Sequence, residues 1–387
     1  MRKWTTVLAL VSFGCSGWDA LPPPEPPAPE PEPPPPAIHV EGDRIVDADG
    51  NELVLRGVNR SGSEYRCVQA TADTDPEHYF FDGPSDAESV TAMAAWNITA
   101  VRIPLNETCW LGINGVLPES SGENYRSAIE TYVGLVLDAG LVPIVDLHWA
   151  APGENQARRL QPMPNREHSE EFWRSVADRF KHEERIVFEP YNEPFPSGNS
   201  NGPAAWDCWQ NGCISDVAVR RGEVATETYE SVGMGQLVSA IRETGARNLI
   251  LLGGVQYSNS LDEWLERRPD DPLGNTAASW HVYNYNPCSD GECWNDAPAR
   301  VASEVPVVAT EIGQDDCGEG EFVAPLLDFL DASANGYLAW SWNAYGECRP
   351  PGSMPYPNPW SLITDYESGT PNGGYARIFY DHLESLR

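Results

Sequence analysis

Residues 185–194 read RIVFEPYNEP, a short apolar run that ends in Asn192, Glu193 and Pro194. Such a run is typical of a buried strand in a parallel sheet. Its last residues carry an amide and a carboxyl group, and burying such groups costs free energy unless they bind one another or a ligand. The segment therefore predicts a sheet with chemically active groups at the carboxyl ends of its strands.

Seven further runs of this kind lie along the chain. They are LVLRGVN (53–59), ITAVRIPL (98–105), LVPIVDLHW (141–149), NLILLGG (248–254), ASWHVYN (278–284), VPVVATEIG (305–313) and GYLAWSWN (336–343). Amphipathic stretches that predict helices separate most of them, at Ala87–Trp96, Tyr125–Ala139, Glu170–Lys181, Met234–Thr244 and Pro325–Ala334. Eight strands alternating with helices predict an α/β fold, a single (β/α)8 TIM barrel with loop insertions over residues 38–387. No glycine-rich phosphate loop follows the first run, which disfavours a nucleotide-binding sheet.

Charge limits the partners that the chain can bind. Its 387 residues carry 58 acidic and 25 basic side chains, a formal net charge of −33. That field repels nucleic acid and anionic lipid, and no basic stretch interrupts it. We expect the protein to be a monomer that binds no nucleic acid. We also expect it to use no metal and no cofactor.

The amino-terminal residues predict export. Arg2 and Lys3 precede a short apolar stretch, Thr6–Gly14, which is too short to span a bilayer. Residues 1–15 are interpreted as a signal peptide of the lipoprotein type, with lipidation at Cys15; plain secretion is the alternative, because Ser12 stands where such signals carry leucine. Residues 16–37 form a Pro/Glu-rich linker that predicts an extended polyproline spacer. Membrane contact is expected only through Cys15.

Eight cysteines follow Cys15, and an even number suits an oxidising compartment. Zinc sites also use closely spaced cysteines, but these pairs lie in Gly/Asp/Trp-rich loops, which favours structural disulfides. We expect Cys208–Cys213 and Cys288–Cys293 as local bridges. Cys67–Cys109 and Cys317–Cys348 are expected to tie strand-end loops together.

Polar residues gather where the predicted strands end. In chain order they are Asn59, Arg102, His148, Asn192 with Glu193, His281 with Tyr283, Glu311, and Trp340 with Trp342. Alone, His148 would be read as a structural histidine and Arg102 as a buried ion-pair partner. Active sites of such barrels form at the carboxyl ends of the strands, so their convergence on one rim favours a functional site.

Two glutamates on opposite strands predict the chemistry. Retaining glycosidases use two carboxyl groups about 5–5.5 Å apart, one as nucleophile and one as proton donor. Glu193 and Glu311 follow the fourth and seventh strands and can face one another across the barrel mouth. Asn192 can bind the 2-hydroxyl of a sugar, and Arg102 with Tyr283 can hold Glu311 ionised.

These residues resemble the motifs of glycoside hydrolase family 5. The matching segments are VRIP, DLHW, YNEP, HVY, TEIG and WSWN, together with LRGVNRSG at the first strand. The resemblance covers nearly all of residues 38–387. It implies Glu193 as acid/base and Glu311 as nucleophile, with sugar-binding or orienting roles for Arg102, His148, Asn192, His281, Tyr283 and Trp342. Trp342 is preferred over Trp340 as the stacking platform because it directly precedes Asn343.

Aromatic residues in the predicted loops agree with a carbohydrate substrate, because the C–H faces of pyranose rings stack on aromatic rings. The candidates are Trp110, Trp149, Trp206, Trp209, Tyr257, Tyr285, Trp294 and Tyr345. We expect three or four of them to touch sugar and the others to fill the barrel rim. The long cysteine-bearing segment 195–234 departs from the family pattern and could cover part of the cleft.

Four functions remain open at this point. The first is a retaining endo-β-1,4-glucanase, and the second is a β-mannanase, xylanase or exo-acting β-glycosidase of the same clan. The third is a non-catalytic carbohydrate-binding surface protein, which the presence of both glutamates disfavours. The fourth is a metallohydrolase using His148 and His281, which the lack of an H-E-x-x-H pattern disfavours.

Overall fold

A computed structural model describes residues 1, 4, 35–220, 223–318, 320–333, 336–348 and 358–387. By its contacts the chain divides into Met1–Pro34 and Pro35–Arg387. Apart from Met1 and Trp4, the expected signal peptide lies outside the described residues, as do Cys15 and most of the expected linker. Within the described part, no helix has the length and apolar character that a membrane span requires.

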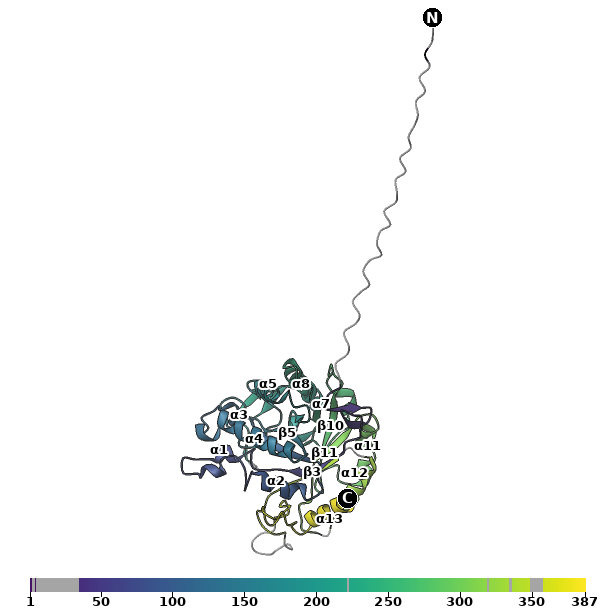
Figure 1. Cartoon of the computed structure of the whole chain (residues 1–387). Helices are drawn as coiled ribbons and strands as arrows, with labels where there is room; N and C mark the ends of the chain where they lie inside the picture. Colours follow the sequence, from purple (N-terminus) through teal and green to yellow (C-terminus); the bar gives the residue numbers. More distant parts are fainter. Residues whose placement is uncertain (2–3, 5–34, 221–222, 319, 334–335, 349–357) are drawn as a thin grey trace. The chain divides into compact units, whose positions relative to one another are not determined.

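Parallel strands of Pro35–Arg387 close into a barrel (Figure 1). Among the described residues its eight strands are β3 (Leu55–Asn59), β4 (Ala100–Asn106), β5 (Val142–Trp149), β6 (Val187–Glu189), β9 (Ile250–Gly253), β10 (Thr276–Tyr283), β11 (Val307–Gly313) and β12 (Gly336–Ala339). They neighbour one another in chain order, and β12 pairs with β3 to close the ring. The predicted TIM barrel is confirmed.

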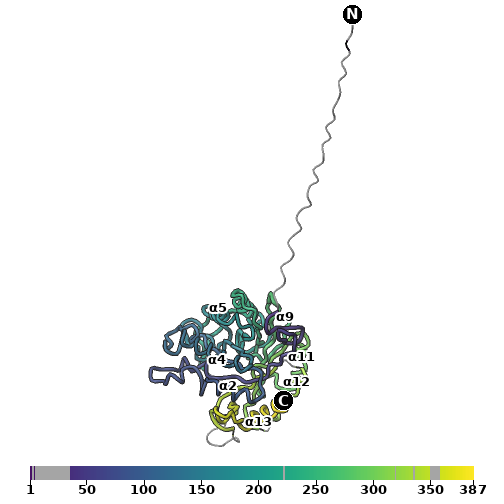
Figure 2. The backbone as a smooth tube through the Cα atoms, viewed as in Figure 1, coloured from purple at the N-terminus to yellow at the C-terminus, as the bar shows by residue number. Residues whose placement is uncertain are grey.

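Helices surround the barrel. The longer ones are α2 (Ala87–Ala94), α4 (Glu123–Asp138), α5 (Ser169–Phe180), α7 (Pro203–Asn211), α8 (Met234–Glu243), α12 (Val323–Ser333) and α13 (Tyr375–Ser385). Shorter turns are α1 (Arg66–Gln69), α3 (Glu107–Leu111), α6 (Pro196–Asn199), α9 (Trp264–Arg267), α10 (Gly291–Trp294) and α11 (Ala297–Ala302), with 3-10 turns at Pro76–His78 and Pro118–Ser120. Helices lie at all five predicted stretches, except that Ala334 lies outside the described residues. The tube in Figure 2 shows the carboxyl-terminal α13 beside α12.

Local sequence explains where these helices begin and what they cover. The Asp86 side chain accepts the backbone N–H of Ser89 and so caps the start of α2. In α5, Phe172, Val176 and Phe180 recur at a spacing of four and form one buried face. Such faces pack on the outside of the barrel and form the larger hydrophobic core.

Alternation along the strands divides the barrel interior into layers. Every second residue points inward. The lower inward positions are apolar, as at Ala100, Ile144 and Val187, and belong to a second core that the hairpin of β1 (Ile38–Glu41) and β2 (Arg44–Asp47) covers. Two residues further along the same strands, the inward positions are charged: Arg102 and Asp146 are the counterparts of Ala100 and Ile144. The barrel therefore presents a buried polar layer directly beneath its carboxyl-terminal mouth.

Disulfides hold the loops above that mouth. The four bridges among the described residues are Cys67–Cys109, Cys208–Cys213, Cys288–Cys293 and Cys317–Cys348, so the predicted pairing is confirmed. The segment after β6 contains α7 and a small hairpin of β7 (Ile214–Asp216) and β8 (Thr228–Glu230). The hairpin, α6 and α7 are the regular elements within the described part of the predicted 195–234 insertion.

Candidate active site

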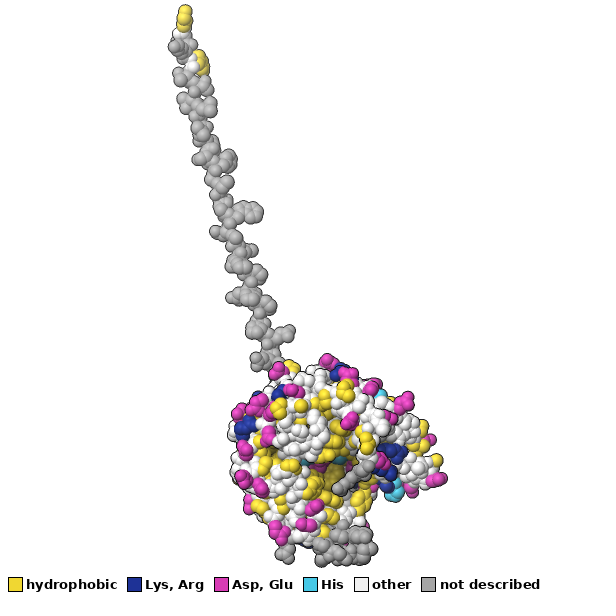
Figure 3. All heavy atoms as spheres, turned by 180° about the vertical axis from the view of Figure 1, so that it is seen from behind, with side chains coloured by type: hydrophobic (Ala, Val, Ile, Leu, Met, Phe, Trp, Pro, Cys, Tyr) yellow, Lys and Arg dark blue, Asp and Glu magenta, His cyan; other side chains and the backbone are white. Residues whose placement is uncertain are grey.

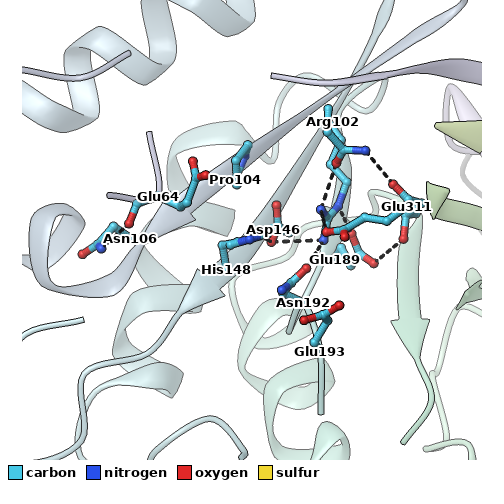
Figure 4. Close-up of polar contacts among 12 residues, drawn as sticks. Glu64, Arg102, Pro104, Asn106, Asp146, His148, Glu189, Asn192, Glu193 and Glu311 are labelled. Atoms are coloured by element: carbon cyan, nitrogen blue, oxygen red, sulfur yellow. Dashed lines mark hydrogen bonds and ion pairs between the residues drawn. The ribbon is translucent and has the colours of Figure 1, made fainter. Parts of the chain in front are cut away.

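Arg102 is the centre of the polar layer (Figure 4). It comes from the inward face of β4, and its side chain is fully buried. The guanidinium donates to Glu189 at 2.5 Å, to Asn59 at 2.9 Å, to Asn192 at 2.7 Å and to Glu311 at 2.8 Å. This forked geometry suits arginine and would not suit lysine. One cation thus orients four groups from the ends of three strands, β3, β6 and β11.

Three buried carboxyl groups share the positive charge of Arg102. Asp146 lies 3.2 Å from the guanidinium, and Glu189 and Glu311 bond it directly. Burial raises the pKa of Asp146 to about 7, and Arg102 opposes this shift. Burial also raises the pKa of Glu189 above its ordinary value. Burial alone would lower the pKa of Arg102, but the surrounding carboxylates raise it, so the arginine stays charged.

Glu193 and Glu311 face one another across the mouth. Glu311 lies on β11 and is 4 % exposed. Glu193 lies four residues beyond the end of β6, and a fifth of its side chain is exposed. An oxygen of each carboxyl lies within 4.8 Å of the other. Figure 3 shows a hollow in one face of the molecule that hydrophobic side chains surround, with histidine and acidic side chains at its floor.

Surroundings give the two carboxyl groups different proton affinities. Burial raises the pKa of Glu193 well above its ordinary value, and the charge of Glu311 raises it further. Burial also raises the pKa of Glu311, but Arg102 and the Tyr283 hydroxyl, which donates at 2.7 Å, oppose that shift. Both expected contacts to Glu311 are present. Both contacts lower its pKa as expected, but burial outweighs them and leaves the pKa of Glu311 above its ordinary value.

His281 connects Glu193 to a chain of hydroxyl groups. Its Nδ1 lies 3.1 Å from a Glu193 oxygen, and its Nε2 lies 3.1 Å from the Thr310 hydroxyl. Thr310 itself donates to Glu189 at 3.0 Å, so towards His281 it can only accept. Burial and the charge of Arg102 lower the pKa of His281 well below its ordinary value. Neutral His281 therefore carries its proton on Nε2, and its Nδ1 accepts a hydrogen bond from the protonated Glu193 carboxyl.

His148 and Trp340 stack on one another beside the polar layer. Asp146 lies 2.9 Å from Nδ1 of His148 and fixes the orientation of the ring. Burial and the charge of Arg102 lower the pKa of His148 to about 3, so the imidazole is neutral. Trp340 stacks on His148, with ring centroids 5.3 Å apart and planes 7° from parallel. Trp340 is partly exposed.

The preference for Trp342 as the platform is wrong. Trp342 is fully buried, and its ring centroid lies 5.0 Å from that of Trp96 in the outer core. The strand β12 ends at Ala339, and the backbone N–H of Trp342 binds the carbonyl of Asn59 instead of continuing the strand. Alternation therefore stops at Trp340, which stacks on His148. Asn192, His281 and Tyr283 lie where the sequence places them, around Glu193 and Glu311.

The aromatic candidates divide into two groups. Trp110, Trp206, Trp209 and Trp294 are buried, whereas Trp149, Tyr257, Tyr285 and Tyr345 are at least partly exposed. Hydrogen bonds explain part of the first group, since Nε1 of Trp209 donates to the Gly253 carbonyl at 2.7 Å. Half of the candidates thus fill the rim, and the other half remain available to a ligand.

Sequence reasoning missed the supports of the site. Asp146, Glu189 and Thr310 lie inside predicted strands and not at the strand ends, where the sequence places the site. The sequence does contain a signal for such supports. A charged residue in an otherwise apolar run, two positions from an inward-facing neighbour, predicts a buried partner.

A metal could use only a limited set of donors. Among the described residues, Glu193, His281 and Glu311 offer one ligand atom each within 4.8 Å of one another. Nδ1 of His281 lies 3.1 Å from an oxygen of Glu193 and 3.6 Å from one of Glu311, and it already accepts the proton of Glu193.

Comparisons with known proteins agree with this geometry. A family model described as Cellulase (glycosyl hydrolase family 5) matches residues 46–346. Endoglucanase A from Butyrivibrio fibrisolvens is 25 % identical over 63 % of this chain, which spans 44 % of that protein's length. A mannan endo-1,4-beta-mannosidase from Salipaludibacillus agaradhaerens is 21 % identical, with 79 % of this chain and 80 % of that protein covered.

Solved structures share the fold. A beta-glucanase from Saccharophagus degradans in complex with cellotetraose superposes with a TM-score of 0.64 at 17 % identity, covering 94 % of this chain and 98 % of the other. A beta-mannanase from Streptomyces thermolilacinus with mannohexaose gives a TM-score of 0.60 at 16 % identity, covering 90 % and 94 %. At such identities the likeness concerns the fold alone.

Proposed function

The chain belongs to glycosyl hydrolase family 5, and from that premise we propose that it hydrolyses β-1,4-linked glucan with retention of anomeric configuration. In this proposal Glu311 is the nucleophile and Glu193 the general acid/base.

One observation carries the mechanism: the oxygens of Glu193 and Glu311 approach within 4.8 Å. Retaining glycosidases hold their carboxyl groups about 5–5.5 Å apart, because the nucleophile must reach the anomeric carbon directly. Inverting enzymes leave about 6.5–9.5 Å so that a water molecule fits between carboxylate and sugar. The short separation supports direct attack.

In the first step Glu311 attacks the anomeric carbon while Glu193 protonates the leaving oxygen. Arg102 and Tyr283 hold the two oxygens of Glu311, at 2.8 Å and 2.7 Å, and favour its ionised form over that of Glu193. Glu193 begins protonated, with its proton shared with Nδ1 of His281. The bond from carbon to leaving oxygen breaks as the bond to the Glu311 oxygen forms, and the proton leaves with the departing alcohol.

In the second step water releases the sugar from Glu311. Formation of the glycosyl-enzyme removes the charge of Glu311, which had raised the pKa of Glu193. Glu193 can then act as the base that deprotonates water. Asn192, oriented by Arg102, is placed to bind the 2-hydroxyl group, a contact that strengthens in the transition state.

The substrate is proposed on the family description and the aromatic surroundings of the hollow. A panel of barley β-glucan, carboxymethylcellulose, galactomannan and xylan, with product analysis, tests it. We expect short oligosaccharides from the two glucans. Strong activity on galactomannan with none on either glucan would favour the β-mannanase alternative, and release of single sugars from chain ends would favour exo action.

We also propose that the enzyme is exported. Four disulfides in the described residues require oxidising conditions to persist. The sequence further favours attachment to a membrane through a lipid on Cys15. Metabolic labelling with an alkyne fatty acid tests this in the native host, where Cys15→Ser should abolish labelling. A wild-type protein that takes up no label would favour plain secretion.

A further inference from the structure

Ser258 is a fully buried residue that takes no part in the mechanism proposed for Glu193 and Glu311. It ends a turn in which Gln256, Tyr257 and Ser258 have φ values of 57°, 60° and 58°. Left-handed backbone is unfavourable for residues with a Cβ atom, and three such residues in a row are rare. Strain of this kind persists only where surrounding contacts enforce it, and it gathers at functional sites.

Hydrogen bonds join Ser258 both to the acid and to the histidine that bonds the acid. The Ser258 hydroxyl donates to the Asn192 carbonyl at 2.8 Å. The Ser258 carbonyl accepts the backbone N–H of His281 at 3.0 Å. Because the Asn192 carbonyl belongs to the peptide unit that enters Glu193, one residue holds the backbone of both members of the Glu193–His281 contact, which measures 3.1 Å.

The same turn holds the chain on the other side of Glu193. The backbone N–H of Tyr257 donates to the Pro194 carbonyl at 3.0 Å. Two successive residues of the turn therefore bind the carbonyl before Glu193 and the carbonyl after it. The Glu193 side chain leaves the backbone between these two bonds, so its direction depends on the turn.

A glycine leaves room for the Ser258 hydroxyl. The strand β9 ends at Gly253, and a Cβ atom at this position would overlap Oγ of Ser258. Apart from Ser258 itself, the nearest atom to such a Cβ would be the Asn192 carbonyl oxygen at 3.6 Å, an ordinary van der Waals contact. The hydroxyl thus occupies the space that a side chain at the end of β9 would fill.

We propose that Ser258 is a positioning residue for acid catalysis. Through its hydroxyl and its carbonyl it holds Glu193 and His281 in the arrangement that proton transfer to the leaving oxygen requires. Gly253 belongs to the same device, because only a residue without a Cβ atom admits the hydroxyl. The proposal rests on the proposed function, since it takes Glu193 as the acid.

Two aryl glycosides test this role. Phenyl β-cellobioside needs a proton on its leaving oxygen, whereas 2,4-dinitrophenyl β-cellobioside needs none, and neither has a sugar beyond the cleaved bond. Ser258→Gly removes the hydroxyl and suits the left-handed backbone. We expect kcat/KM on the phenyl glycoside to fall at least about tenfold and kcat/KM on the dinitrophenyl glycoside to fall less than about threefold. Thermal unfolding checks that the variant is folded.

The pH profile gives a second measure of the acid. In Ser258→Gly the bond from protonated Glu193 to Nδ1 of His281 loses its support, so the protonated form becomes less favourable. The basic limb of kcat/KM on phenyl β-cellobioside should then move to lower pH by about 0.5 unit. A general loosening of the fold would lower the rate at every pH and leave the limb in place, and an unmoved limb overturns the proposal.

Gly253 supplies a matched set of variants. Gly253→Ala puts a methyl group where the Ser258 hydroxyl lies, so it should reproduce the selective loss. In the double variant Gly253→Ala with Ser258→Gly the methyl group enters the vacated space, and the loss should be no larger than with Ser258→Gly alone. Ser239→Ala, which removes an exposed hydroxyl on α8, should change neither rate.

Glu193→Ala separates failure of this role from failure of the proposed function. If Glu193→Ala loses far more on the phenyl than on the dinitrophenyl glycoside while Ser258→Gly loses equally on both or on neither, only the positioning role is overturned. If Glu193→Ala itself loses equally on both, Glu193 is not the acid, and both proposals fail. Should the wild-type enzyme accept mannan and no glucan, the corresponding aryl β-mannobiosides carry the same comparison.

Discussion

At the scale of single residues, the site depends on one buried cation among several buried acids. Arg102 compensates Asp146, Glu189 and Glu311, none of which has another cation within ion-pair distance among the described residues. Removing one partner from a buried ion pair is more costly than replacing the whole pair, because it leaves an uncompensated charge. The arginine is thus as important for folding as for orienting the nucleophile.

Arg102→Met should lower the free energy of unfolding by about 3–5 kcal/mol at pH 8. Without the cation, the carboxyl pKa values in the folded protein rise further above their unfolded values. In the variant, stability is then lost as the pH rises from the unfolded-state pKa values of these carboxyl groups through their folded-state values, and it is retained below that range. Urea unfolding at pH 5 and pH 8 should show the larger deficit at pH 8, whereas Arg377→Met, at an exposed arginine, should show none. A deficit that is independent of pH would contradict the assignment.

The pH dependence of activity follows from the two glutamates. Glu311 must be ionised and its pKa is raised, so the acidic limb of kcat/KM should lie above pH 4.5. Glu193 must be protonated, so activity should fall as pH rises through its strongly raised pKa. A full pH profile on barley β-glucan checks both limbs. A plateau that reaches below pH 4 would contradict the burial of Glu311.

Thr310→Val tests the hydrogen-bond chain through His281. Losing the Thr310 hydroxyl leaves Nε2 without an acceptor, so the proton of neutral His281 moves to Nδ1 and donates to ionised Glu193. This stabilises the ionised form and lowers the pKa of Glu193, so the basic limb should move to lower pH by about 0.5–1 unit. Thr91→Val on the exposed face of α2 serves as the control. An unchanged or upward-shifted limb would show that His281 already donates to Glu193.

At the scale of elements, disulfides hold the loops in place. The alternation of inward-facing and outward-facing residues along the strands places the polar layer. Strand runs and amphipathic helices predicted the barrel because each has its own period of burial. The same logic failed beyond the last residue of β12, where Trp342 leaves the strand and packs on Trp96. The raised pKa of Glu311 was also missed, because burial depends on residues far apart in the chain.

The disulfides should differ in what they contribute. Cys67–Cys109 closes a loop of 42 residues, whereas Cys288–Cys293 closes one of 5. Loop-closure entropy then gives about 4 kcal/mol for the first bridge and about 2 kcal/mol for the second. Urea unfolding of the two double Cys→Ala variants measures the difference. Equal destabilisation would show that local strain, rather than closure of the unfolded chain, controls the effect.

At the scale of the whole molecule, surplus negative charge opposes folding. The excess of acidic groups gives a net charge of −33, and these like charges repel one another most strongly in the compact folded state. Raising NaCl from about 0.02 to 0.5 M shortens the screening length from roughly 20 Å to about 4 Å. The free energy of unfolding at pH 8 should therefore rise with salt. A decrease would show that surface ion pairs, such as Arg179 with Glu130, outweigh the repulsion.

Packing across the whole molecule decides which features the sequence could predict and which it could not. The order of the strands followed from chain order, and the facing of Glu193 and Glu311 followed from their places on the fourth and seventh strands. The groove of about 710 Å³ beside the β7–β8 hairpin did not follow, because segment 214–219 and Tyr257, which both line it, are far apart in the chain.

The separate roles of Glu193 and Glu311 are tested most directly by chemical rescue. Glu193→Ala should still form the glycosyl-enzyme from 2,4-dinitrophenyl β-cellobioside, whose leaving group needs no proton, and should then accumulate it. Added azide should restore turnover and give β-cellobiosyl azide, while Glu311→Gln should stay inactive with or without azide. A Glu193→Ala enzyme that is equally inactive on activated and natural substrates, or an azide product of α configuration, would contradict the account.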